Sequence, residues 1–96
     1  MCLYTDYPLI WRNIRITVRH CPAWYSSVGL SVQHIEIISP NSEPLPVTET
    51  GYRSHFMCGP DPLADYGGDP VAYVTAWLDY EARANGWKVE NQLSLL

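Results

Sequence analysis

The clearest hydrophobic pattern in the chain lies near its C-terminal end. Apolar residues recur there at spacings of three and four, with two aromatic residues beside them: Val71, Val74, Leu78 and Ala82, flanked by Tyr73 and Trp77. This spacing places apolar side chains on one face of an α-helix. Asp69 and Pro70 provide an N-cap acceptor and a preset first turn, and Asn85-Gly86 suits a C-cap. The pattern predicts one amphipathic helix, from the Asp69 cap to about Ala84, packed on a sheet.

Strand patterns occupy the earlier part of the chain. From Trp11 to His20, apolar and polar residues alternate, and Cys21-Pro22 is expected to end this first strand. Residues 31–39 are rich in β-branched side chains and are followed by Pro40, which predicts a second strand. Residues 47–57 predict a third strand, with Gly51 allowing a bulge. The last two segments are expected to form an antiparallel hairpin with a loop of about seven residues.

The remaining segments are less regular. Residues 1–10 contain Pro8 and predict an N-terminal arm or an edge segment. Residues 59–69 are crowded with proline, glycine and aspartate and predict a loop, with one helical turn at Pro62 to Tyr66. Residues 87–96 alternate enough to predict a terminal strand, with a tail as the alternative. The fold class expected for residues 1–96 is a single α+β domain with a small antiparallel sheet of three to four strands.

Composition narrows the class of protein. Four Trp and seven Tyr in 96 residues supply enough apolar area for one core, which argues against a disordered chain. The formal net charge of −4 disfavours direct nucleic-acid binding and favours a basic protein surface as partner. No run approaches the roughly 18 apolar residues of a membrane span, so no membrane association is expected. The oligomeric state is left open.

The three cysteines are an odd number for a disulfide-stapled secreted domain. Cys2, Cys21 and Cys58 are therefore expected to be reduced and free of metal, and the protein to work in a reducing cytosol. A zinc site would need Cys21 and Cys58 together with His20, His34 and His55. Their spacing lacks a repeated Cys-x-x-Cys unit, and neighbouring strand residues point to opposite faces. No metal or other cofactor is predicted.

Two alternatives from other functional classes remain open. A small Cys/His-dependent enzyme or metal-site protein would use Cys58, His55 and Glu49, but no nucleophile elbow or phosphate-binding loop accompanies them, and no catalytic residue is assigned. A nucleic-acid-binding accessory protein would use the strand face that carries Arg15 and Arg19.

A stretch from Ser54 to Ala82 combines acidic and aromatic residues and contains no Lys or Arg. Aromatic side chains can fill pockets on a partner, while carboxylates steer it into place. An alternative interpretation assigns Tyr73 and Trp77 to the core and the acids to a solvated loop. The residues predicted to bind a partner are Asp61, Asp65, Tyr66, Tyr73, Asp79, Tyr80 and Glu81, with Tyr66 and Tyr80 as anchors.

Two sequence blocks, PLPVTETGYRSHFM and DPVAYVTAWLDYEA, resemble small proteins of bacterial plasmids, integrative elements and phages. They lie within residues 44–82. The resemblance implies a mobile-element setting, and with it the cytoplasm of a bacterial host, and it carries no assigned catalytic residue. By analogy, small acidic proteins of such elements include inhibitors of host defence, anti-CRISPR proteins among them. The predicted function is therefore a protein-binding inhibitor, not an enzyme, that occupies a surface of a bacterial defence complex of the CRISPR-Cas type, such as its nucleic-acid-binding subunit.

Overall fold

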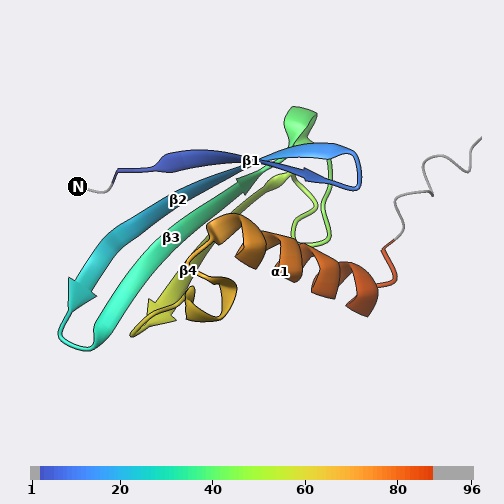
Figure 1. Cartoon of the computed structure of the whole chain (residues 1–96). Helices are drawn as coiled ribbons and strands as arrows, with labels where there is room; N and C mark the ends of the chain where they lie inside the picture. The colour runs from blue at the N-terminus through green and yellow to red at the C-terminus, as the bar shows by residue number, and fades with distance from the viewer. Residues whose placement is uncertain (1–2, 88–96) are drawn as a thin grey trace, which may run out of the picture.

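The computed structural model describes residues 3–87 as a four-stranded antiparallel sheet with one α-helix across one face (Figure 1). The strands are β1 (Thr5–Trp11), β2 (Ile14–Ser27), β3 (Leu30–Ile38) and β4 (Tyr52–Gly59), and the helix is α1 (Pro70–Ala84). Short 3-10 turns η1 (Pro40–Ser42) and η2 (Ala64–Tyr66) lie in the connections. Strand order in space follows the chain. The predicted α+β class with one packed helix is confirmed.

The first hairpin corrects the predicted start of the first strand. The sequence predicted one strand from Trp11 to His20, but Arg12 and Asn13 form a two-residue turn with φ of 48° and 69°. Trp11 ends β1 and pairs with Ile14 across that turn. Type I′ hairpin turns need positive φ at both central positions, and only Asn13 is a residue type that signals one. The segment expected as an arm or edge thus contains β1, which lies at one edge of the sheet.

The predicted end of β2 at Cys21-Pro22 is wrong, because the strand continues to Ser27. Its pairing with β3 shifts register between Cys21 and Tyr25, so Pro22 falls where the ladder is already interrupted. Pairing with β1 ends at His20, so within residues 3–87 no strand pairs with Pro22 on that side. A proline is tolerated at such a position because no ladder hydrogen bond needs its missing N–H.

The connection from β3 to β4 is longer than predicted. β3 matches the second predicted strand, but β4 begins at Tyr52, so residues 47–51 belong to the connection. Leu45 and Val47 of this connection are buried as part of the core. Their apolar side chains gave the segment the composition of a strand. Gly51 is not in a bulge. Its φ is +81°, and a Cβ atom there would lie 2.5 Å from Ser39 Oγ, so glycine is required for the close approach.

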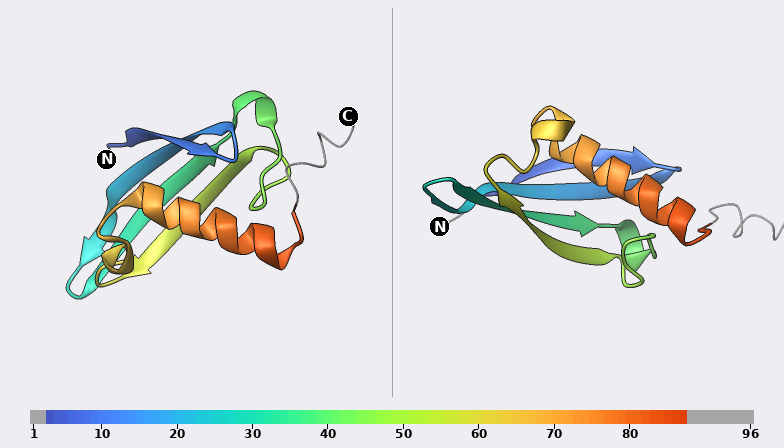
Figure 2. Two further views of the ribbon diagram at one scale, coloured as in Figure 1. Left: turned by 45° about the vertical axis from the view of Figure 1, so that its right-hand side comes forward. Right: turned by 90° about the horizontal axis from the view of Figure 1, so that it is seen from below.

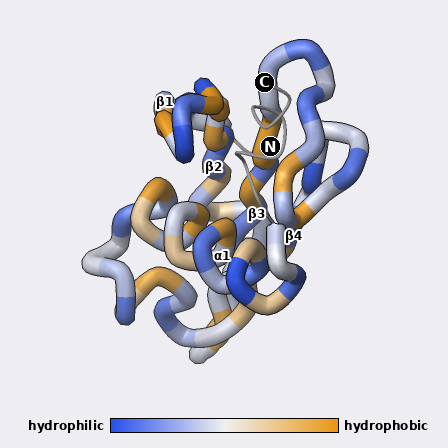
Figure 3. The backbone as a smooth tube through the Cα atoms, turned by 90° about the vertical axis from the view of Figure 1, so that its right-hand side faces the viewer, coloured by the Kyte–Doolittle hydropathy of each residue, from blue (hydrophilic) through white to orange (hydrophobic). Residues whose placement is uncertain are grey.

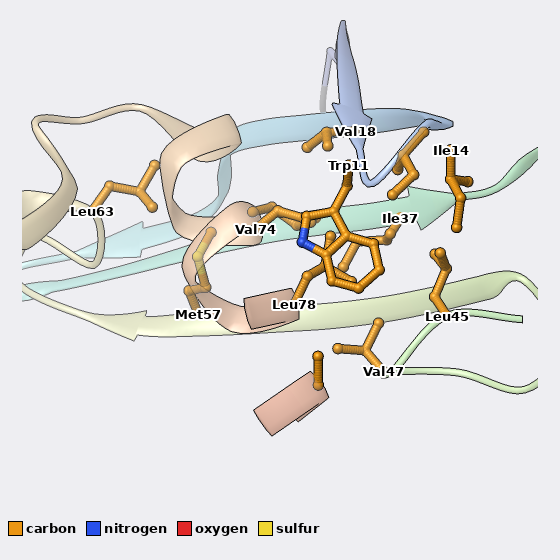
Figure 4. Packing of buried hydrophobic residues seen from close by; sticks show 13 residues of the cluster. Trp11, Ile14, Val18, Ile37, Leu45, Val47, Met57, Leu63, Val74 and Leu78 are labelled. Carbon is orange, nitrogen blue, oxygen red and sulfur yellow. The ribbon is translucent and has the colours of Figure 1, made fainter. Parts of the chain in front are cut away.

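The core lies between α1 and the face of the sheet that it covers (Figures 2 and 3). Figure 4 shows Trp11, Val18, Ile37, Val74 and Leu78 packed together there.

Both predicted helix caps are confirmed. Asp69 Oδ1 accepts a hydrogen bond from the Val71 amide at 2.9 Å, and Asn85 is the C-cap with Gly86 at φ 64°. The predicted terminal strand or tail spans residues 87–96, and only Trp87 of this segment lies within the described residues.

The cysteines differ from the prediction. Cys21 is buried and disulfide-bonded, so the expectation that all cysteines are reduced is wrong at this position. Cys58 is a free, exposed thiol on β4. Because structural disulfides are typical of oxidising environments, the number of cysteines no longer supports a reducing compartment.

Candidate binding surfaces

A groove lies on the outer flank of α1. Its volume is about 420 Å³, and it is lined by Tyr66, Tyr73, Ala76, Trp77, Tyr80 and Arg83. We call it the helix groove. Three of the residues predicted to bind a partner, Tyr66, Tyr73 and Tyr80, meet in it.

The helix presents this flank because the lining residues are out of phase with the core. Val74, Leu78 and Ala82 are buried at four-residue spacing, whereas Tyr73, Trp77 and Tyr80 follow the neighbouring flank. Tyr66 comes from η2, where the left-handed residues Gly67 and Gly68 turn the chain back toward the start of α1. Its ring meets the ring of Tyr73 edge-on at a centroid distance of 5.1 Å. The groove is therefore built from two separate elements.

The inner wall of the groove rests on β4. His55 Nε2 lies 3.1 Å from the Tyr73 hydroxyl, and the His55 ring is 4.6 Å from that of Trp77. The Arg53 guanidinium stacks over Trp77 at 5.3 Å. Burial raises the pKa of Tyr73. Burial and, secondly, the nearby Arg53 charge lower the pKa of His55. Both side chains are therefore uncharged near neutral pH, which suits apolar contacts in the groove.

The predicted acidic residues lie outside the groove. Asp61 and Asp65 are exposed in the loop that leads to α1. Asp79 faces the other way, because its Oδ1 accepts a 2.8 Å hydrogen bond from Trp11 Nε1 of β1. Glu81 accepts a hydrogen bond from the Asn85 side chain at 3.3 Å. The charged residue in the groove wall is a cation, Arg83.

Sequence reasoning missed Trp77 and Arg83 as groove residues. Trp77 was assigned to the flank of the apolar stripe. The acidic and aromatic stretch was defined to end at Ala82, one residue before Arg83. The signal was present in the helical spacing, because Tyr73, Trp77, Tyr80 and Arg83 follow one another at intervals of four, three and three residues.

The face of the sheet that α1 leaves uncovered carries a second aromatic cluster around His34. His34 is 5% exposed, and its two ring nitrogens meet the Tyr4 hydroxyl at 2.5 Å and Ser54 Oγ at 2.6 Å. Phe56 stacks on the His34 ring at 4.5 Å, and Trp24 lies 5.2 Å from Phe56. Trp24 and Phe56 are each about half exposed. We call this side of the sheet the open face.

Arg15 and Arg19, the residues of the alternative nucleic-acid interpretation, lie on this open face. Arg19 is bound on both sides, by Asp6 at 3.2 Å and by Glu36 at 2.6 Å. Glu36 also accepts a 2.7 Å hydrogen bond from Tyr52, and this bond raises the pKa of that phenol. Arg15 is exposed but lies near the start of β2, away from Trp24 near its end. The face therefore offers balanced charge rather than a basic track.

A family model described as the KlcB third domain matches residues 4–87. The chain belongs to this family. No curated protein and no solved structure matches it. A KlcB-type domain indicates a plasmid-associated protein, which agrees in broad terms with a mobile-element setting. Within residues 3–87, no helix is long and apolar enough to cross a membrane.

The alternative enzyme or metal constellation is not assembled in the fold. His55 and Cys58 are three residues apart on β4, so the strand sends His55 toward α1 and Cys58 to the open face. Glu49 is exposed in the connection before the strand. In the described part of the chain, no group of three or more His, Cys, Asp or Glu side chains is placed to hold a metal ion.

Proposed function

We propose that this domain is a protein-binding module whose contact surface is the helix groove. The observation that carries the proposal is the lining of the groove, in which four aromatic side chains and one arginine converge on a single hollow. Tyr, Trp and Arg are the residue types that most often anchor protein interfaces. Tyr80 is 62% exposed although it is a large aromatic side chain, so it is available to a partner.

The charges around the groove describe the partner. Arg83 in the wall calls for a carboxylate on the partner, placed beside an apolar anchor. Asp61 and Asp65 are exposed in the loop that also carries Tyr66, and they favour a basic rim around that anchor. We therefore propose a partner with an apolar, carboxylate-bearing centre and a basic periphery. The partner class to test first is a bacterial defence complex, whose inhibition would suit a mobile-element protein.

The test begins by capturing partners from a bacterial lysate with the tagged full-length chain and identifying them by mass spectrometry. The variant Tyr66→Ala/Tyr80→Ala should then weaken binding of the captured protein by roughly thirtyfold, because two anchors are truncated. Tyr25→Ala is the matched control, since Tyr25 is 56% exposed and lies outside the groove. Equal affinity of all three proteins would reject the groove as the binding site.

Inhibition is a separate step of the proposal. Once a partner is bound, its activity should fall in proportion to occupancy, and the groove variant should restore that activity at the same protein concentration. If a partner binds through the groove without losing activity, the domain is still a binding module, but the proposal that it is an inhibitor is rejected.

A further inference from the structure

Three polar side chains on the open face form a connected hydrogen-bonded series that the helix groove does not use. Ser54 Oγ lies 2.6 Å from His34 Nε2, and the Tyr4 hydroxyl lies 2.5 Å from His34 Nδ1. His34 is on β3, Ser54 is on the neighbouring strand β4, and Tyr4 immediately precedes β1. The fold therefore brings a hydroxyl, an imidazole and a second hydroxyl together, although they are far apart in the sequence.

The three residues differ in exposure in the way that a nucleophile and its base require. Ser54 is exposed, so a molecule in solution can reach its Oγ. His34 is only 5% exposed, and its ring is fixed by the stacked Phe56 at 4.5 Å and by the edge-on Tyr4 at 5.7 Å. Activated serines are recognised by a base within hydrogen-bonding distance and a third group that orients the base. Tyr4 lies at the position of that third group.

The proton positions that activate Ser54 follow from these contacts. When Nδ1 of His34 carries the ring proton and donates a hydrogen bond to the Tyr4 oxygen, Nε2 is left to accept one from the Ser54 hydroxyl. The imidazole can then take the hydroxyl proton as Ser54 attacks, while Tyr4 holds the ring as a positioning residue. We propose that Ser54 is a nucleophile activated by His34, and that it accepts an acyl group from an ester.

The surroundings of Ser54 define the class of ester. Phe56 and Trp24 are each about half exposed, and their ring centroids are 5.2 Å apart, so an aromatic group of a substrate can lie against them. Arg19 is paired with Glu36 at 2.6 Å, so its charge is not available to bind an anionic ester. The substrate class is therefore an uncharged ester that carries an aromatic group.

The reaction transfers the acyl group in two steps. Ser54 Oγ bonds to the ester carbonyl carbon, and His34 Nε2 takes the hydroxyl proton. The bond to the leaving oxygen breaks, and that oxygen receives the proton from His34 and departs as an alcohol. Water then attacks the acyl-serine with His34 again as base, which releases a carboxylic acid and restores Ser54. A positioned base contributes about 10²–10⁴-fold, which suits an ester with a good leaving group rather than an amide.

The first experiment compares two serines within one protein. The full chain carrying Cys58→Ala, which removes the exposed thiol as a competing nucleophile, is incubated with phenylmethanesulfonyl fluoride. This aromatic reagent sulfonylates an activated serine with loss of fluoride, and peptide mass spectrometry follows each serine over time. Ser54 should react at least about 100-fold faster than Ser26, because only Ser54 has the positioned base. Ser26 is the internal control, since it is exposed near the end of β2.

The second experiment assigns the roles with p-nitrophenyl acetate, whose hydrolysis is followed by the release of p-nitrophenolate. In the same Cys58→Ala background, Ser54→Ala and His34→Gln should each slow hydrolysis about 100-fold, because the nucleophile or its base is lost. Ser26→Ala should leave the rate unchanged. Circular dichroism and thermal unfolding show whether each variant keeps the fold.

Tyr4 needs a readout that a purely structural role would not change. Tyr4→Phe keeps the ring but removes the oxygen that accepts from Nδ1 of His34. The variant should slow hydrolysis and move the midpoint of its pH profile to lower pH, because the imidazolium form loses an acceptor. The charged and titratable groups around the cluster are kept in this variant: Asp6, Arg19, Glu36, Tyr52 and His55.

Two results would overturn the proposal. One is equal sulfonylation of Ser54 and Ser26, a comparison that does not depend on how well any active-site variant folds. The other is hydrolysis that Ser54→Ala does not reduce. Ser54 lies on the open face, on the side of the sheet away from the helix groove, so Ser54→Ala should bind a groove partner as tightly as the unchanged chain. Failure of the serine site and failure of the groove are therefore distinguishable.

Discussion

The covered and open faces of the sheet are built from alternate residues of the same strands, yet they are held in different ways. On β3, the side chains of Ile35 and Ile37 are fully buried on the covered face, between the sheet and α1. Glu36 lies between them and points to the open face, where it binds Arg19 and Tyr52. The covered face is held by apolar burial, and the open face by hydrogen bonds and ion pairs.

The difference between the faces indicates where mutations can be tolerated. Buried apolar groups have no alternative environment in the fold, so their loss opens a cavity. The ion pair of Arg19 with Asp6 on the open face is near water, which can replace a lost partner. Within residues 3–87, every buried side-chain nitrogen or oxygen has a hydrogen-bond partner. The open face is therefore ordered, but stability should depend mainly on the covered face.

The largest expected effect comes from truncating the covered face. Leu78→Ala should lower the free energy of unfolding by about 2–5 kcal/mol, because Leu78 is completely buried against the sheet. Phe56→Ala on the open face should cost less than about 1.5 kcal/mol, because its ring is already half exposed. Urea denaturation of both variants measures the difference. Similar losses would mean that the open face supports the fold as strongly as the core.

A smaller effect is expected where the helix is tied to β1. Asp79→Ala should cost about 1–3 kcal/mol, because the Trp11 indole N–H loses a charged acceptor. Asp65→Ala is the control, since Asp65 is exposed in η2. The same denaturation experiment applies. If Asp79→Ala is no more destabilising than the control, the tie does not hold the helix over the covered face.

The N-terminal cap of α1 should contribute less again. Asp69→Ala should cost about 0.5–2 kcal/mol, because the Val71 amide loses its side-chain acceptor. Asp69→Asn keeps an acceptor at this position and should recover most of the loss, as thermal unfolding would show. If Asp69→Asn is more stable than Asp69→Ala, the hydrogen bond to the Val71 amide stabilises the helix independently of the charge of Asp69.

The smallest expected effect is a pH dependence from His55. Its pKa in the folded state lies below the unfolded value of 6.5, chiefly through burial. The unfolded chain therefore binds the proton first, and stability should fall as pH drops below 6.5 toward the folded pKa. Thermal unfolding between about pH 5 and 8 should show this slope, reduced in His55→Gln. An unchanged slope in the variant would assign the dependence to other groups.

Elements with local signals could be predicted from the sequence, and elements fixed by distant contacts could not. The helix and its caps follow from Asp69, Pro70 and the apolar spacing. The Arg12-Asn13 turn lacks a glycine, and Pro22 is tolerated because of a register shift in the pairing with β3. Tyr66 and Tyr80 could be proposed as surface residues because Tyr66 sits in a loop and Tyr80 lies off the apolar stripe. The engagement of Asp79 depends on Trp11, 68 residues earlier, and no local pattern encodes it.

The same contact between Trp11 and Asp79 predicts an order of events during folding. Each strand pairs with the strand next to it in the chain, so the sheet can form by successive hairpin closures. Within residues 3–87 the helix is the last element in chain order, and it must return to the first strand to cover the core. Closing that large loop has the greatest entropic cost, which favours late docking of the helix. Weakening this contact should then speed unfolding while leaving the refolding rate nearly unchanged.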